Sequence, residues 1–288
     1  MSNIALLILY NHRYDKNIPV LENLYSKRFS NIFHLIPFYD GDKDNVIPVY
    51  EHSWYFQGYI SQAYTHLKKK GFTHFFIVAD DMVLNPALNE NNLFNEMGLA
   101  EDECFLDYLH ILSKLDWRWY QLRAMKYKLK QRGVEAYREL PSKEEALVQF
   151  KKYGIPHAKM SIKPFLSSHL DYIFTYLVNY KRRIPDYPLV GGYADIALIT
   201  AEAMDKFTKY CGAFSATKLF VELAIPTALV LSTDKLRLSK ELKFKSGALW
   251  TPEEKAFLDN YNYSLDALLK DFPKERLFLH PIKLSQWK

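Results

Sequence analysis

The stretch that decides the fold is Phe75-Phe76-Ile77-Val78-Ala79-Asp80-Asp81-Met82-Val83-Leu84-Asn85-Pro86. Its first four residues are aromatic or β-branched, and such a run predicts a buried strand. Two adjacent carboxylates follow, then a short apolar step and a proline that ends the run. In an α/β protein, acids at the carboxyl end of a buried strand lie where open sheets bind their ligands.

Asp80 and Asp81 admit two interpretations. Hard divalent cations bind carboxylate oxygens and bridge them to phosphates, so the pair can hold a metal ion. Asp is also favoured at helix N-caps and in turns, so the pair can simply end the strand. The pair alone favours the structural interpretation slightly, and the rest of the chain has to decide between the two.

Length and composition place the chain among ordinary globular proteins. It has 288 residues, 49% apolar and 25% charged, enough for one large α/β domain or two small ones. The aromatic content of 16% suits clefts for sugar rings or bases as well as cores. The net charge is +5, and cations outnumber acids between Lys114 and Arg138, which predicts a local basic face.

The cysteines and the N-terminus indicate a cytoplasmic protein. Two cysteines, Cys104 and Cys211, exclude a disulfide framework and a Cys-rich zinc module. The apolar start, residues 4–10, lacks a preceding basic region and is far too short to span a bilayer. We therefore expect a reduced cytoplasmic protein whose chain begins with a strand.

The first hundred residues alternate between strands and helices. Residues 4–10 and 31–38 are continuous apolar runs typical of parallel strands covered on both faces, and residues 18–29 and 55–70 are amphipathic. Lys68-Lys69-Lys70-Gly71 is typical of a helix C-terminus. The order strand, helix, strand, helix, strand predicts one α/β domain over residues 1–288, with a mostly parallel, Rossmann-like sheet flanked by helices.

Residues 99–163 predict a helical insertion or lid within that domain. We expect helices over residues 104–112, 117–131 and 133–153, the last beginning near Pro141-Ser142-Lys143. The second helix is basic and carries Trp119 and Tyr120, so it could make a peripheral contact with an anionic membrane. A solvated helix packed on its aromatic side is the commoner outcome.

Two further acids stand out in the second half. Asp195 follows Gly191-Gly192-Tyr193, and paired glycines allow close backbone approach to a ligand and open space beside the acid. This is no phosphate loop, because the Gly-x-Gly-x-x-Gly spacing is absent. Glu222 lies in an otherwise apolar run, so it has a partner or faces a cleft.

The chain ends with a helical region and a strand-like run. Residues 250–271 predict helix, with Thr251 as N-cap and Pro252 at the first helical position. The last residues are Leu277-Phe278-Leu279-His280-Pro281-Ile282-Lys283-Leu284-Ser285-Gln286-Trp287-Lys288.

The ordered set of these segments resembles the GT-A glycosyltransferases. Their Asp-x-Asp motif stands at the end of a similar strand and is followed by Met or Val and then Leu. Ala79 occupies the place of the first Asp, and Asp81 matches the second. This departure implies weaker metal binding, a metal held mainly by Asp81, or no metal. The resemblance covers residues 4–96 and 185–288 and leaves the insertion unexplained.

The resemblance also implies roles for distant residues. In several GT-A families a C-terminal His completes the metal site and a Lys contacts the diphosphate, which implies Asp81 and His280 as ligands of Mn²⁺ or Mg²⁺ and Lys283 at the diphosphate. His280 taken alone is more typical of a structural histidine. An inverting enzyme needs a carboxylate base, for which Asp195 is slightly preferred over Glu222 because of the adjacent glycines. The implied nucleotide contacts are Tyr10, Asn11, Arg13, Asp40 and Asp80.

The function implied is a metal-assisted, inverting glycosyltransferase that moves a sugar from a nucleotide-sugar donor. A UDP-sugar is expected, with galactose a guess, and the acceptor is a glycan or lipid-linked glycan of bacterial surface polysaccharide such as O-antigen, handled at the inner membrane face. A sugar nucleotidyltransferase is an alternative, although residues 11–14 lack the Gly-rich loop that this class needs. A non-catalytic basic protein that binds membranes or nucleic acid is another, although no nucleic-acid-binding signature is present.

Overall fold

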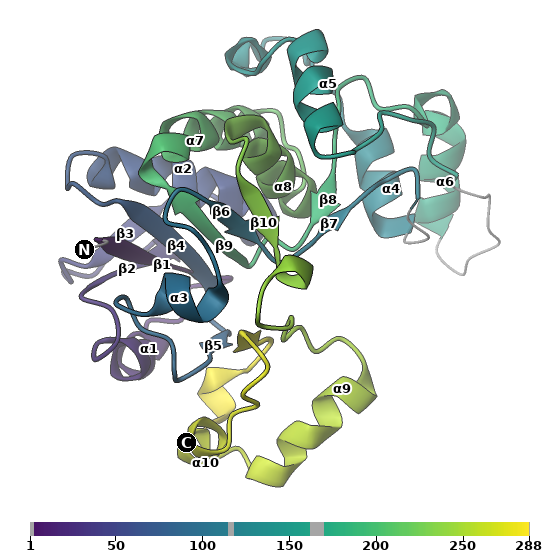
Figure 1. The fold of residues 1–288 in the computed structure, drawn as a ribbon. Coiled ribbons are helices and arrows are strands. Elements are labelled where there is room, and N and C mark those ends of the chain that lie inside the picture. Colours follow the sequence, from purple (N-terminus) through teal and green to yellow (C-terminus); the bar gives the residue numbers. More distant parts are fainter. Residues whose placement is uncertain (1–2, 115–117, 162–169, 288) are drawn as a thin grey trace.

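A seven-stranded sheet forms the centre of the computed structural model, which describes residues 3–114, 118–161 and 170–287 (Figure 1). Its strands, in sheet order, are β10 (Leu236–Leu238), β6 (Cys104–Leu106), β9 (Ile196–Thr200), β4 (His74–Ala79), β1 (Ile4–Leu9), β2 (Asn31–Pro37) and β3 (Val46–Val49). Neighbouring strands are parallel except at β9, which is antiparallel to β4 and β6. The predicted α/β architecture, with a mostly parallel sheet flanked by helices, is confirmed.

Both faces of the sheet are covered, which explains the uninterrupted apolar strands. Successive residues of β1 enter two different cores: Ala5, Leu7 and Leu9 enter one, and Ile4, Leu6 and Ile8 the other. The helices that supply the first core include α2 (Phe56–Leu67), α7 (Ala201–Ala216) and α8 (Val221–Ser232). Those that supply the second are α1 (Asn17–Tyr25), α3 (Leu93–Met97) and α10 (Leu265–Lys270).

Several predicted helix ends are confirmed by their capping interactions. Thr251 caps α9 (Pro252–Ala256) through a capping box with Glu254. Ser142 caps α5 (Lys143–Lys152) in the same way through Glu145. A side-chain N-cap of this kind stabilises a helix by about 1 kcal/mol, so the local sequence sets these ends without tertiary contacts.

The predicted helix over residues 104–112 is wrong. Its first residues form β6, and Leu109–His110 form β7, which pairs with β8 (Gly191–Gly192). Cys104–Leu106 is fully buried between β9 and β10, so burial in the sheet overrides the local helical preference. The stretch 99–163 is therefore not helical throughout.

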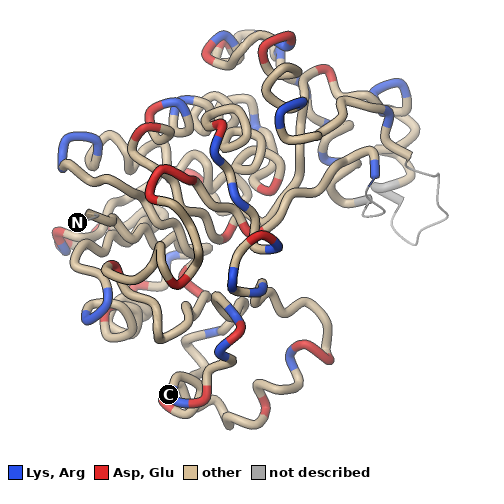
Figure 2. Tube along the Cα trace, in the orientation of Figure 1, with Lys and Arg blue, Asp and Glu red and all other residues tan. Residues whose placement is uncertain are grey.

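The remaining predicted helices of this stretch are shorter than expected. Residues 117–131 give α4 (Arg118–Lys126), with Trp117 outside the described residues, and 133–153 give a short 3₁₀ turn and α5. α6 (Leu170–Asn179) extends the helical region beyond residue 163, and Figure 1 shows α4, α5 and α6 together at one end of the sheet. Figure 2 shows Lys and Arg at several positions of this region.

The C-terminal run folds back on the deciding stretch. β11 (Phe278–Leu279) pairs antiparallel with β5 (Val83–Leu84), and the backbone N–H of Asn85 donates to the carbonyl of Leu277 at 2.9 Å. The end of the chain therefore lies at the edge of the sheet where Asp80 and Asp81 stand. Among the described residues, no helix combines the length and the apolar character required to cross a membrane.

Candidate functional site

Strand direction brings three acids to one edge of the sheet. Asp80 and Asp81 follow the carboxyl end of β4, and the N–H of Asp80 donates to the carbonyl of Leu9 at the end of β1 (2.9 Å). Because β9 runs antiparallel to β4, the start of β9 lies at the same edge. There the N–H of Ala79 donates to the carbonyl of Asp195 at 2.9 Å, so the third acid adjoins the first two.

His280 reaches this edge through the β5–β11 pair. The N–H of Ile282 donates to the carbonyl of Asp81 at 2.6 Å, which holds the chain end against the acids. His280 Nε2 lies 2.8 Å from Asp81 Oδ1, and His280 Nδ1 lies 2.6 Å from the hydroxyl of Tyr193. Two predicted ligands nearly 200 positions apart in sequence are thus in contact.

The carboxylates govern the charge of His280. Burial alone would lower the pKa of the imidazole, but the hydrogen bond with Asp81 and the charges of Asp195 and Asp80 raise that pKa above its ordinary value. The surroundings of the imidazole therefore favour its protonated, positively charged form.

Asp80 and Asp81 have different environments. Asp80 is 3% exposed, and it accepts hydrogen bonds from the Asn11 N–H (3.2 Å) and from Asn17 Nδ2 (3.4 Å). Burial and the neighbouring charge of Asp81 raise the pKa of Asp80 to about 7. The Asp81 side chain is 33% exposed. Asp81 therefore presents oxygens outward, while Asp80 anchors the loop after β1.

Glu222 faces the same edge from the first turn of α8. Burial and the charge of Asp195 raise the pKa of Glu222 to about 7, against hydrogen bonds from Trp119 and Tyr120 that lower it. Burial likewise raises the pKa of Asp195. The charge of His280 lowers this pKa, and the charge of Asp81 raises it further. Both acids remain partly exposed. We call Asp80, Asp81, Asp195, Glu222 and His280 the acidic edge.

The expectation that the paired glycines open space beside Asp195 is wrong. A Cβ on Gly191 would lie 2.7 Å from the Tyr120 ring, and one on Gly192 would lie 2.5 Å from the carbonyl oxygen of Tyr108 and 2.9 Å from Pro226. The glycines admit neighbouring parts of the chain itself, which let β8 pack under α8. Their presence therefore no longer favours Asp195 over Glu222.

The predicted nucleotide contacts do not form one group. Tyr10 is fully buried, and its hydroxyl bonds to His34 Nδ1 at 2.8 Å, so its side chain belongs to the core. Arg13 and Asp40 come together in an exposed ion pair that also includes Asp15 (3.2 Å). The hydrogen bond from Arg13 lowers the pKa of Asp40.

Lys283 and Asn11 are each linked to one of the paired acids by a backbone hydrogen bond, directly or through the adjacent residue. Lys283 is exposed, one position after the residue that bonds to Asp81, and Asn11 is exposed while its backbone N–H holds Asp80.

Tyr193 and Tyr120 are site residues that sequence reasoning missed. Tyr193 bonds to His280 and stacks on Phe278 with ring centroids 5.6 Å apart, and Tyr120 contacts Glu222. The chain has 21 tyrosines, and nothing in their local sequence separates these two from tyrosines that only pack.

The donor atoms fit a hard divalent cation that shares its coordination with a ligand. Asp81 and His280 supply an oxygen and a nitrogen side by side, and no group of three or more metal-binding side chains occurs among the described residues. Mg²⁺ and Mn²⁺ are commonly bound through one or two protein groups together with phosphate oxygens and water. The pair suits such a site better than a closed structural metal centre.

Comparison with known proteins finds similar structures but no matching family model or curated sequence. No protein-family model matches the chain, and no curated protein matches its sequence. Among solved structures, core-mannan synthase A from Aspergillus fumigatus in its Mn/GDP form is similar with a TM-score of 0.39 and 10% identity, covering 84% of this chain and 74% of that chain. This likeness is too weak to assign a function, which has to be argued from the site.

Proposed function

We propose that the protein is a metal-assisted glycosyltransferase that uses a nucleotide-sugar donor. The observation that carries this proposal is the contact of Asp81 with His280, 2.8 Å apart, at the carboxyl edge of a mostly parallel sheet beside Asp195 and Glu222. Open α/β sheets bind nucleotides at this edge. The resemblance of the strand ending in Asp81 and of the segment around His280 to GT-A enzymes supports the same function.

Asp81 and His280 would hold Mn²⁺ or Mg²⁺. When bound, such a cation neutralises the charge of the leaving diphosphate. Lys283, exposed and next to Ile282, whose N–H bonds to Asp81, would contribute a second positive charge to the diphosphate. Asn11 and the loop that carries Arg13 and Asp40 would contact the nucleoside.

Glu222 is the base in this proposal. The acceptor hydroxyl loses its proton to the Glu222 carboxylate while its oxygen attacks the anomeric carbon of the donor. The bond between that carbon and the diphosphate oxygen breaks, and the nucleoside diphosphate leaves with the electron pair, so the anomeric configuration inverts. A base with a pKa of about 7 suits this step at neutral pH.

The donor is proposed to be a UDP-sugar and the acceptor a glycan or lipid-linked glycan of bacterial surface polysaccharide. A sugar nucleotidyltransferase remains the alternative, and a panel of UDP- and GDP-sugars assayed for both sugar transfer and diphosphate exchange separates the two. Only a nucleotidyltransferase converts the nucleotide sugar and labelled diphosphate into a labelled nucleoside triphosphate and a sugar 1-phosphate.

Calorimetric titration with nucleoside diphosphates tests the proposal directly. We expect Mn²⁺-dependent binding that is lost on adding chelator and in Asp81→Ala and His280→Ala. The matched controls Asp266→Ala and His66→Ala remove exposed residues of the same types and should bind normally. Because His280 is buried, thermal unfolding of each variant must show that it folds. Binding that survives chelation refutes the metal role, and absence of nucleotide binding refutes the function.

A further inference from the structure

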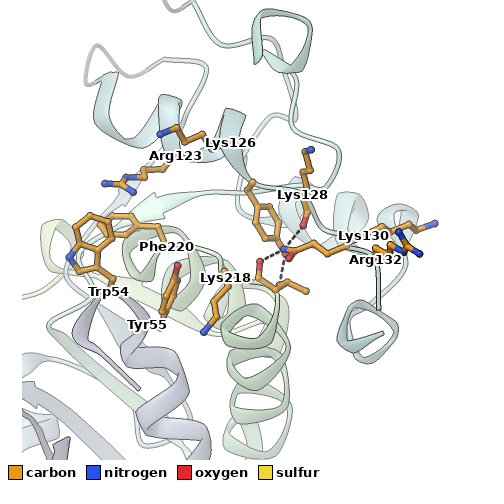
Figure 3. Close-up of a pocket in the computed structure, with 12 residues that line it drawn as sticks. Trp54, Tyr55, Arg123, Lys126, Lys128, Lys130, Arg132, Lys218 and Phe220 are labelled. Carbon is orange, nitrogen blue, oxygen red and sulfur yellow. Dashed lines mark hydrogen bonds between the residues drawn. The ribbon is translucent and has the colours of Figure 1, made fainter. Parts of the chain in front are cut away.

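A cavity of about 580 Å³ lies beside the N-terminus of α8 (Figure 3). Six cations line it, and none of its described lining residues is an acid: Arg123, Lys126, Lys128, Lys130, Arg132 and Lys218. We call it the basic cavity. An excess of one charge in a concave site focuses the field and attracts ligands of opposite charge.

Four of these cations form a row of exposed, alternate positions along one short segment. Between Lys126 and Arg132 the even-numbered residues are exposed, and the intervening odd-numbered residues are buried or half-buried. Tyr127 and Gln131 fix the segment, because the Tyr127 hydroxyl lies 2.9 Å from Thr217 Oγ1 and Gln131 Nε2 donates to the Thr217 carbonyl at 2.5 Å. Lys126 ends α4, and the chain then bends at residues 129 and 130 and turns at 131–134, so these cations lie on one short, irregular segment. Several cations gathered on one short segment suit a ligand with repeated charges.

The charges of this row are not compensated within the described chain. Lys126, Lys128, Lys130 and Arg132 form no ion pair with a described residue. Other exposed lysines do, such as Lys152, which lies 2.8 Å from Asp234. A row of unpaired cations repels itself, and an external anion relieves that repulsion.

Aromatic rings adjoin the cations at one end. The Arg123 guanidinium lies 4.3 Å from the ring centroids of Trp54 and Trp119, and the Trp54 and Phe220 rings meet edge to face at 5.9 Å. Figure 3 shows Trp54, Phe220 and Arg123 grouped at this end. Trp54 is 46% exposed, so part of its apolar surface is open to the C–H face of a sugar ring.

The basic cavity adjoins the acidic edge. Phe220 lines the cavity and is the N-cap of α8, and Glu222 lies in the first turn of that helix. Trp119, whose ring contacts Arg123, also hydrogen-bonds to Glu222. The cavity therefore lies within one helical turn of the proposed base along α8.

A second cavity, of about 860 Å³, shares part of its lining with the basic cavity. Lys128 and Lys130 line both cavities, and the second adds Arg138, Lys143 and Arg182 together with the acids Glu144 and Asp186, of which Asp186 pairs with Arg182. The two adjoining cavities together offer more room than a single sugar or phosphate requires, which favours a chain-like ligand.

We propose that the basic cavity binds an acidic glycan, a sugar chain that carries carboxylate or phosphate groups, and positions it as the acceptor. This inference rests on the proposed function and specifies its acceptor. The row of cations binds the charged groups of the chain, and the rings at Trp54 and Phe220 contact the sugar next to Glu222.

Fluorescence anisotropy with labelled oligogalacturonate and a phosphate-bearing mannan oligosaccharide tests the proposal. The triple variant Lys128→Gln/Lys130→Gln/Arg132→Gln should bind the acidic probes roughly tenfold more weakly, since each exposed charge contact contributes a factor of about 2. The control Lys27→Gln/Lys69→Gln/Lys240→Gln removes the same charge from exposed sites elsewhere and should change binding less than about twofold. Maltooligosaccharide, which is neutral, should bind far more weakly than either acidic probe.

Trp54→Ala separates recognition of a glycan from plain attraction of anions. This variant should bind the acidic oligosaccharides several-fold more weakly than the parent protein does. Its affinity for inorganic polyphosphate should be unchanged, because polyphosphate has no sugar ring to contact the indole. The proposal is overturned if both triple variants lose affinity for the acidic probes equally, or if neither acidic probe binds the parent protein. Binding confined to single-stranded RNA or to phosphatidylglycerol vesicles also overturns it, in favour of a nucleic-acid or membrane surface.

Nucleotide binding measured on the same samples keeps the two proposals apart. Normal Mn²⁺-dependent nucleotide binding without glycan binding refutes this inference alone. Glycan binding without nucleotide binding refutes the glycosyltransferase and leaves an acidic-glycan-binding site.

Discussion

The acidic edge and the basic cavity are neighbours that the chain builds in opposite ways. The acidic edge joins residues from four distant segments, and its groups are buried or half-buried and interact with one another. Most cations of the basic cavity come from one short segment, are exposed and lack ion-pair partners among the described residues. A site for chemistry needs fixed geometry, which tertiary contacts supply, whereas a surface that attracts a charged chain needs only density of charge.

This comparison predicts that function at the acidic edge depends on single atoms. Glu222→Gln keeps the shape of the side chain but removes the base, so we expect sugar transfer to slow by about 10²–10⁴-fold. Asp195→Asn should retain more activity and move the acid limb of the pH–rate profile to lower pH, because the charge of Asp195 raises the pKa of Glu222. Transfer to acceptor, measured across pH, checks both. Full activity of Glu222→Gln would instead assign the base to another group.

Glu222 should also lower the free energy of unfolding at high pH. The pKa of Glu222 is raised from 4.5 to about 7 in the folded protein, so between these values the unfolded chain binds fewer protons and stability falls as pH rises. The loss approaches about 3 kcal/mol above pH 7, and it is absent below pH 4.5. Glu222→Gln removes it, so the variant should be more stable than the parent only at the higher pH.

Urea unfolding on both sides of this pH range measures the difference. Glu275→Gln, at an exposed site, is the control and should behave like the parent protein. A pH-independent effect of Glu222→Gln would show that burial does not disfavour its charge.

A weaker effect is expected from a residue that only positions the site. Tyr193→Phe removes the hydroxyl that bonds to His280 Nδ1, which leaves the ring free to turn away from Asp81. Loss of such a supporting hydrogen bond weakens metal binding by about 10-fold or more. Mn²⁺ titration followed by electron paramagnetic resonance checks this, with Tyr64→Phe, whose hydroxyl bonds to Asp205 on the surface, as control. Unchanged Mn²⁺ affinity would remove Tyr193 from the site.

The smallest expected effect is on the stability of the basic cavity variants. Exposed cations without partners contribute little to folding, so each of Lys128→Gln, Lys130→Gln and Arg132→Gln should change the free energy of unfolding by less than about 0.5 kcal/mol. Chemical denaturation checks this. A large loss of stability in any of the three would show that the segment is part of the folded core rather than a binding surface.

The sequence by itself determined the elements whose signals are local. The apolar runs of β1, β2 and β4, the helix start near Ser142 and the cap Thr251 depend on neighbouring residues, and these predictions are confirmed. The helix predicted to end at Lys70 stops three residues earlier, at Leu67. The acids after β4 and the cations between Lys126 and Arg132 were likewise visible, because composition and order are properties of the chain.

Only the tertiary structure decided which distant residues meet and which spaces are filled. Asp195 adjoins Ala79 because β9 runs antiparallel, and His280 contacts Asp81 because β11 pairs with β5; no local pattern encodes either strand direction or pairing. Burial turned residues 104–106 into a strand, and close packing filled the space expected at Gly191 and Gly192. The deciding stretch thus supplied the acids, and long-range pairing gave them their partners.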